Sequence, residues 1–194
     1  MQLLLTNMHK WWYRTHIGCI GKKKQEEVCA MLNAVQIAEY FLSKDPDRRY
    51  FNKHVISKNG RDFYEGNARL NKYLHISQNL YIAKTGQKLF SDDLYAYDNG
   101  AVAVKVQQNY SILTQRHTSP CIPDDIKSFL DKIYIAYQNA TLDELIEISH
   151  DDDEWIDKHV FYKKDDQRMD SLSRVQEYKE QYGDMLKVLD RMKV

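Results

Sequence analysis

The stretch SHDDDEWIDKH, residues 149–159, has the densest group of side chains that could bind a metal ion. Imidazole and carboxylate groups are the ligands that divalent metals use in hydrolases. The candidate ligands are His150, Asp152, Asp153, Asp157 and His159. The alternative is structural, because acids at a helix start stabilise its dipole and Trp155 would anchor a short helix. We favour this structural interpretation and expect neither a metal nor a cofactor.

Other catalytic patterns are absent from the sequence. It has no GxGxxG, no Walker loop, no GxSxG and no HExxH. His54, His75 and His117 have no partners at ligand spacing, so we expect ordinary roles for them. The sequence therefore predicts a protein that is not an enzyme.

Composition narrows the classes of partner. The chain of 194 residues has 28 basic and 28 acidic side chains, so no global basic field draws it to nucleic acid or anionic lipid. Its 14 tyrosines suit either packing at the edge of the core or an interaction surface. The three cysteines are widely spaced and match no zinc or disulfide pattern. With no apolar run long enough for a signal peptide or a membrane span, we expect a cytoplasmic protein.

Residues 1–30 have no sustained hydrophobic period, and we expect them to lie outside the fold. Glu26, Glu27 and Val28 can be encoded by a purine-rich ribosome-binding sequence upstream of Met31. One hypothesis is therefore that the natural protein begins at Met31 and that the leader is translated upstream sequence. The alternative is an N-terminal arm that docks on the domain through its aromatic residues.

Residues 31–194 are predicted to form one mainly α, compact multi-helix domain. Apolar residues at helical spacing predict helices near 33–44, 68–85, 101–112 and 124–137, a capped helix from 141, a short acidic one from 151 and a C-terminal helix over 170–192. The turn signals between 50 and 67 suit a short hairpin or a folded insertion. Asn33 is expected to cap the first helix, and a capping box is expected between Thr141 and Glu144. The apolar residues expected to face inward on the C-terminal helix are Leu172, Val175, Tyr178, Tyr182, Met185, Leu186 and Leu189.

A short strand and turn unit is predicted around residues 87–100. Gly86 suits the left-handed end of a helix, after which Leu89 and Phe90 fold back over that end. Residues 94–97 read as a strand, with Leu94 and Ala96 on one face and Tyr95 and Tyr97 on the other. The Asp-Asn-Gly ending at Gly100 is expected to turn the chain into the next helix.

The order of these segments resembles the Panacea, or SocA-like, domain family, whose members are often described as phage-associated proteins. The resemblance covers roughly residues 31–160. The matching positions are Gly86, Leu89, Phe90, Ala96, Tyr97, Gly100, Val102, Leu142, Leu145, Ser149, His150 and Trp155. The family's usual proline after the turn glycine is Ala101 here, and the link over 45–66 is longer than usual.

This resemblance implies a non-enzymatic antitoxin that neutralises a cognate toxin by direct contact and is encoded in a prophage or mobile element. One alternative is a phage regulatory or anti-defence protein that binds a host complex or nucleic acid. Another is the metal-dependent hydrolase considered above. The candidate partner-binding residues are Asp92, Asp93, Tyr95, Tyr97 and Asp98. Acids around exposed aromatic residues suit a basic toxin, whereas the structural alternative is that the tyrosines seal an edge and the acids cap turns.

Overall fold

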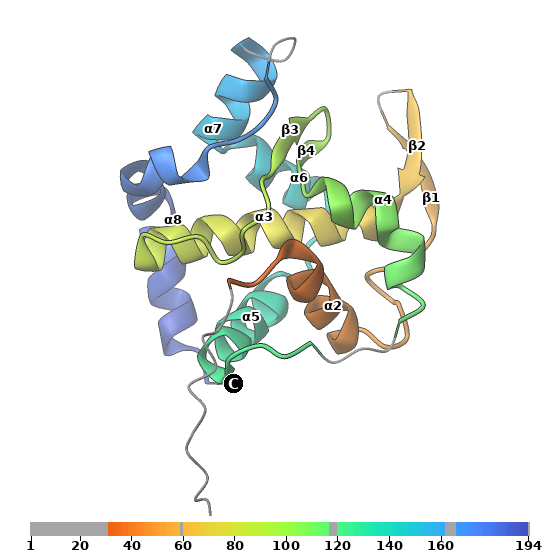
Figure 1. Ribbon diagram of the computed structural model, residues 1–194, viewed down its shortest axis with the longest axis horizontal. Helices are drawn as coiled ribbons and strands as arrows, with labels where there is room; N and C mark the ends of the chain where they lie inside the picture. The colour runs from red at the N-terminus through yellow and green to blue at the C-terminus, as the bar shows by residue number, and fades with distance from the viewer. Residues whose placement is uncertain (1–30, 59, 117–119, 162–165, 194) are drawn as a thin grey trace, which may run out of the picture. The chain divides into compact units, whose positions relative to one another are not determined.

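The structure is a computed structural model that describes residues 31–58, 60–116, 120–161 and 166–193 (Figure 1). The predicted leader, residues 1–30, and His117 lie outside these ranges. The elements in chain order are α2 (Ala34–Lys44), β1 (Val55–Lys58), β2 (Arg61–Tyr64), α3 (Glu65–Thr85), β3 (Tyr95–Tyr97), β4 (Gly100–Val102), α4 (Val104–Leu113), α5 (Asp124–Tyr137), α6 (Leu142–His150), α7 (Asp153–Ile156), the π-helical turn η1 (Asp157–Phe161), the 3₁₀ turn η2 (Ser171–Arg174) and α8 (Val175–Arg191). The predicted mainly α class is confirmed.

Helix α3 is the centre of residues 31–194. A surface helix buries one stripe, but here every residue from Arg69 to Leu80 is buried, whether apolar or polar. The surrounding helices α2, α4, α5, α6 and α8 all contact it, and Figure 1 shows it running between them. The polar side chains on α3 must therefore find their partners inside the protein.

The helix ends follow local sequence signals. Asn33 caps α2 through a capping box with Gln36, as the start of the first helix predicts. Thr141 and Glu144 form the expected capping box at the start of α6. Gly86 ends α3 with φ 73°, in the left-handed region where glycine avoids the strain of a side chain.

Two short antiparallel hairpins complete the fold. Strands β1 and β2 confirm the hairpin alternative for residues 50–67. Strands β3 and β4 pair Tyr95 with Val102 and Tyr97 with Gly100. The prediction that a helix starts at Ala101 is therefore wrong: Gly100 turns the chain into a second strand, and α4 begins at Val104.

The C-terminal region differs from its prediction in two places. Residues 171–174 form a 3₁₀ turn before α8, and α8 then runs through Gly183 as one α-helix. Leu172 was expected to face inward but is 41% exposed, because it lies in that turn rather than on the packed face of α8. Tyr178, Tyr182 and Leu189 are buried as expected.

Candidate functional site

The β3–β4 hairpin holds the tyrosines of the candidate partner surface. Leu94 and Ala96 are buried while Tyr95 and Tyr97 are half-buried, which is the alternation predicted from the sequence. The free edge of β3 is covered by residues 167–169, since the Ala96 N–H donates to the Gln167 carbonyl over 2.8 Å. The hairpin is thus held on both sides.

Buried side chains of α3 and α6 bind the backbone of Ala101. Its N–H donates to Ser149 Oγ over 3.0 Å, and its carbonyl accepts from Lys72 Nζ over 3.1 Å. A Cβ added at Gly100 would overlap both Lys72 Nζ and Ser149 Oγ, so only glycine leaves room for this approach. Both backbone groups of Ala101 are therefore satisfied without a further strand.

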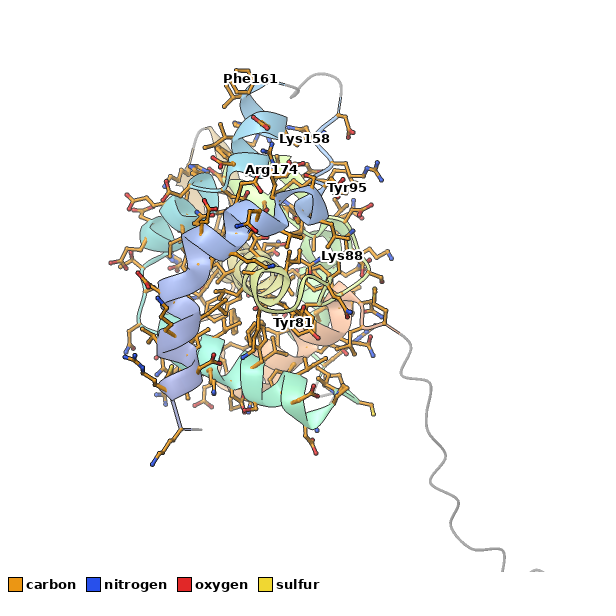
Figure 2. The ribbon with its side chains drawn as sticks, turned by 90° about the vertical axis from the view of Figure 1, so that its left-hand side faces the viewer. Tyr81, Lys88, Tyr95, Lys158, Phe161 and Arg174 are labelled. Atoms are coloured by element: carbon orange, nitrogen blue, oxygen red, sulfur yellow. The ribbon has the colours of Figure 1, made fainter. Side chains whose placement is uncertain are left out.

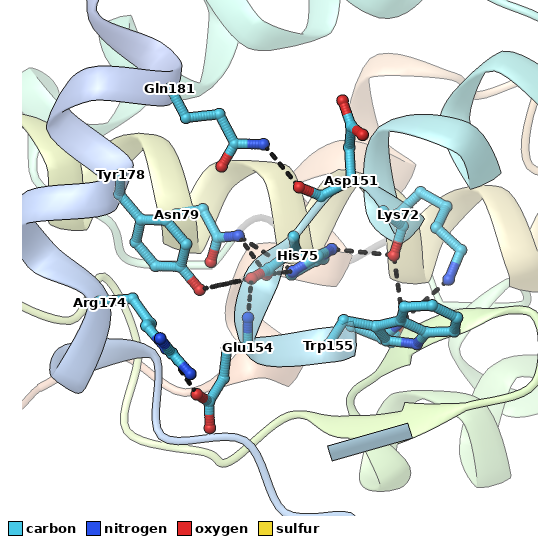
Figure 3. Close-up of polar contacts among 12 residues, drawn as sticks. Lys72, His75, Asn79, Asp151, Glu154, Trp155, Arg174, Tyr178 and Gln181 are labelled. Atoms are coloured by element: carbon cyan, nitrogen blue, oxygen red, sulfur yellow. Dashed lines mark hydrogen bonds and ion pairs between the residues drawn. The ribbon is translucent and has the colours of Figure 1, made fainter. Parts of the chain in front are cut away.

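His75, labelled in Figure 3, is buried and contacts Asp152 through one ring nitrogen and Ser149 through the other. Its Nε2 is 2.6 Å from Asp152 Oδ2, and its Nδ1 is 3.0 Å from Ser149 Oγ. Because a carboxylate only accepts, Nε2 is the donor in the first contact. The expectation that His75 has no special partners is wrong. Its partners lie 77 and 74 residues away in the sequence, beyond the reach of any spacing rule.

The Asp152 carboxylate accepts further hydrogen bonds. Asn79 Nδ2 donates to Oδ2 over 2.8 Å, Tyr178 Oη donates over 3.1 Å, and the Glu154 N–H donates to Oδ1 over 2.8 Å. Burial acts to raise the pKa of Asp152, but the hydrogen bonds from His75 and Asn79 outweigh it and hold that pKa below its ordinary value. The carboxylate is a buried anion on which α3, α7 and α8 converge.

A serine, a histidine and an aspartate in contact resemble the catalytic triad of a serine hydrolase. In that arrangement the serine bonds Nε2 and the acid bonds Nδ1, whereas here the two nitrogens are exchanged. All three side chains are at most 1% exposed, so the serine is closed to a substrate in this structure. The interactions that these side chains make are hydrogen bonds that join α3, α6, α7 and the β3–β4 hairpin.

Lys72 is the buried amine of this region. Its side chain is 1% exposed, and burial lowers its pKa to about 7. It lies at one end of a series of hydrogen bonds that runs through Ala101, Ser149 and His75 to Asp152. The polar residues of α3 in this series, with Asn79, are spaced by three and four positions, which places them on one face of the helix. That spacing is the signal by which the sequence could have revealed them.

Trp155 lies between two histidines. The His150 ring stacks on it with centroids 4.0 Å apart, and the His159 ring stacks with centroids 4.4 Å apart. Its indole N–H donates to the Tyr97 carbonyl over 3.1 Å, and the residue is 6% exposed. Burial, with a smaller contribution from Lys72, lowers the pKa of His150 to about 4.

Two of the three acids among the candidate metal ligands make other contacts. Asp152 binds the buried donors described above, and Asp157 pairs with Arg174. Across residues 31–58, 60–116, 120–161 and 166–193, no three histidine, cysteine, aspartate or glutamate side chains gather in a way that could hold a metal ion.

The candidate partner-binding acids each have a basic neighbour. Asp92 accepts from the Ala34 N–H over 2.8 Å and pairs with Lys105 over 2.8 Å. Asp93 pairs with Lys88 over 3.2 Å and with Arg168 over 3.6 Å.

Asp98 pairs with Arg61 over 3.3 Å and lies 3.8 Å from His159 Nε2. Local pairing therefore offsets the negative charge of all three acids at this surface. The ring centroids of Tyr95 and Tyr97 lie 6.5 Å apart.

Leu89 and Phe90 cover the end of α3 as their pattern predicts, and both are buried. The Gln78 side chain fixes them: its Oε1 accepts from the Leu89 N–H over 2.9 Å, and its Nε2 donates to the Phe90 carbonyl over 3.3 Å. The side chain of a buried α3 residue thereby sets the path of the chain after Gly86.

Comparison with known proteins gives one family. The model of the family described as "Antitoxin SocA-like, Panacea domain" matches residues 70–156, which confirms the resemblance seen in the sequence. That range contains the buried series of hydrogen bonds and the β3–β4 hairpin. No curated protein and no solved structure matches the chain. No helix in the described residues is both long and apolar enough to cross a membrane.

Proposed function

Because residues 70–156 match the antitoxin SocA-like, Panacea domain, we propose that this protein is a non-enzymatic antitoxin that neutralises a cognate toxin by direct contact in the cytoplasm. The family match carries the proposal. The family match itself supports a protein partner in general. The proposal adds that this partner is a toxin, that the toxin is basic and that the gene lies in a prophage or mobile element.

A rigid hairpin supports a binding role. The β3–β4 hairpin is held by Ser149 and Lys72 beneath it and by residues 167–169 at its edge. Tyr95 and Tyr97 are thereby presented on a fixed backbone, and a tyrosine contributes a large contact area at a low cost in entropy. Figure 2 shows Tyr95 on the face that also carries Lys88.

We propose that the partner surface consists of Asp92, Asp93, Tyr95, Tyr97 and Asp98. Exposed ion pairs contribute only about 0–1 kcal/mol, so exchanging one basic neighbour for another costs little. The Asp93 side chain is 34% exposed and shares its charge between two basic residues. A cationic side chain of a basic toxin can replace one of them.

The test is co-expression with the product of the adjacent reading frame, scored by growth and by pull-down. We expect Tyr95→Ala combined with Asp93→Lys to weaken neutralisation and capture while the melting temperature stays nearly unchanged. Asp93 suits this test better than Asp92, whose carboxylate also caps the Ala34 N–H. A matched control is Tyr50→Ala with Asp47→Lys, the same two residue types in the loop after α2.

Neutralisation that survives the Tyr95/Asp93 double change would place the interface elsewhere, with the C-terminal helix over 170–192 as the next surface to examine. The absence of a toxic neighbouring gene, together with binding to a host complex, would replace the antitoxin role with a phage regulatory or anti-defence one.

A further inference from the structure

Strand β2 has one edge that faces away from β1. The Glu65 N–H donates to the His54 carbonyl over 2.8 Å, so these two residues form a hydrogen-bonded pair at the end of the ladder. Bonded and non-bonded pairs alternate along an antiparallel ladder. Asp62, opposite Ser57, is therefore in a non-bonded pair and directs its N–H and C=O outward.

Tyr64 lies two residues further along β2, so its N–H also points outward. Within the described ranges, no hydrogen bond from another element reaches the backbone of Asp62 or the N–H of Tyr64. Unpaired backbone groups on an edge strand form a template for a further strand.

A pocket of about 140 Å³ follows this edge. It touches Arg61, Asp62 and Phe63, which are consecutive residues, whereas a pocket on one face of a strand would touch alternate ones. Lys72 and Tyr97 line it from α3 and β3. Its size is close to the roughly 150 Å³ cavity that holds one benzene molecule, so it accommodates a single side chain.

A second hollow continues along the strand and is lined by Asp62, Phe63 and Tyr64. Successive residues of an extended chain point to opposite sides, so residues two apart would fill the two hollows. The charged residues of the first pocket are Arg61, Asp62, Lys72 and Asp98. The two carboxylates at least balance Arg61 and the buried Lys72 amine, so the pocket has no excess of positive charge, which favours an occupant with uncharged side chains over a polyanion.

We infer that the outer edge of β2 takes up an extended, uncharged segment of a partner protein as an added strand, with one side chain in the pocket beside Lys72 and Tyr97. The inference rests on the proposed function only in assigning a protein partner. The pocket adjoins the proposed partner surface, since Tyr97 and Asp98 belong to both. Main-chain hydrogen bonds would supply affinity and the pocket would supply selectivity.

The test compares Asp62→Pro with Ser57→Pro in the full chain. Proline is tolerated where a strand N–H faces outward, so both variants keep the hairpin. Both also disturb the contact between Ser57 Oγ and Asp62 Oδ1 equally. Only Asp62→Pro removes the donor at the edge beside the pocket, so Ser57→Pro is the matched control.

The probe is a display library of short random peptides, selected on the wild-type protein. We expect the selected peptides to bind wild type and Ser57→Pro and to lose at least tenfold in affinity for Asp62→Pro. In hydrogen exchange, they should slow the amides of Asp62 and Tyr64. Peptides that bind all three proteins equally, or a library that yields none, would overturn strand addition.

This outcome is independent of the toxin assay. Neutralisation by a toxin that leaves the Asp62 and Tyr64 amides exchanging freely would also reject strand addition, while leaving the antitoxin role intact. Peptide binding that depends on the edge of β2, in the absence of a toxic neighbouring gene, would support strand addition and count against the antitoxin role.

Discussion

His75 Nε2 donates to Asp152 Oδ2 over 2.6 Å, with both side chains buried in the middle of the protein. Removing His75 takes the shortest hydrogen bond from a buried carboxylate, to which Asn79, Tyr178 and the Glu154 N–H still donate. We therefore expect His75→Ala to lower the free energy of unfolding by about 3–5 kcal/mol. Urea denaturation at neutral pH measures this change.

The control for His75→Ala is Asp190→Ala, which removes the exposed ion pair between Lys84 and Asp190. Exposed pairs contribute about 0–1 kcal/mol, so this variant should unfold almost as the wild type does. Equal effects of the two substitutions would mean that the buried contact contributes no more than a surface one.

Replacing Lys72 should change how stability depends on pH. The pKa of Lys72 falls from 10.5 to about 7 on folding because of burial. Between these values the unfolded chain holds a proton that the folded chain lacks, so stability rises with pH across this window, and the full penalty applies below it. Lys72→Met removes this contribution, and the loss of the donor to Ala101 costs a similar amount at every pH.

The stability of Lys72→Met relative to wild type should therefore be greatest at pH 6 and should decline toward pH 10. Thermal melts at several pH values measure this difference. The exposed Lys179→Met is the control and should show no such trend. A difference between Lys72→Met and wild type that is constant with pH would contradict a buried, readily deprotonated lysine.

His150 predicts an effect in the acid range. Burial lowers its pKa from 6.5 to about 4, so on acidification the unfolded chain takes up a proton before the folded chain does. Stability should fall as the pH drops through this window. Its Nε2 is buried and has no hydrogen-bond partner among the residues that the structure describes, so His150→Phe keeps a ring on Trp155 and loses none of the described hydrogen bonds there. We expect a flatter profile for His150→Phe between pH 6.5 and 4, and an unchanged slope would count against this role.

Two glycines should respond to substitution with opposite signs. Gly86 has φ 73°, a conformation that a β-branched side chain resists, so Gly86→Val should destabilise the protein by about 1 kcal/mol or more. Gly183 lies within α8 with open space around it, so Gly183→Ala should stabilise the protein by about 0.5–1 kcal/mol. A Gly86→Val variant that melts no lower than wild type would contradict the assignment of Gly86 as a left-handed helix end, and a Gly183→Ala variant that melts lower would contradict the open helical position of Gly183.

Local features of the fold were predictable because their causes are local. The caps at Asn33 and Thr141, the end of α3 at Gly86 and the alternation around Tyr95 each depend on residues a few positions apart. The order of such segments was also enough to indicate the resemblance to the Panacea domain, whose model matches residues 70–156. Strand β4 was missed because its pairing with β3 and the contacts of Ala101 outweigh the helical signal of residues 101–103.

The sequence by itself determined that the chain is mainly helical, the caps at Asn33 and Thr141 and the face of the strand that carries Tyr95 and Tyr97. Only the tertiary structure decided that Lys72 and His75 of α3 meet Ser149 and Asp152, because spacing within α3 says nothing about residues more than 70 positions away. It also decided that the acids near Tyr95 have basic neighbours. Hydrogen bonds and ion pairs act over a few ångströms in space, so partners more than 70 residues apart in the chain are set by packing around α3 rather than by any local pattern.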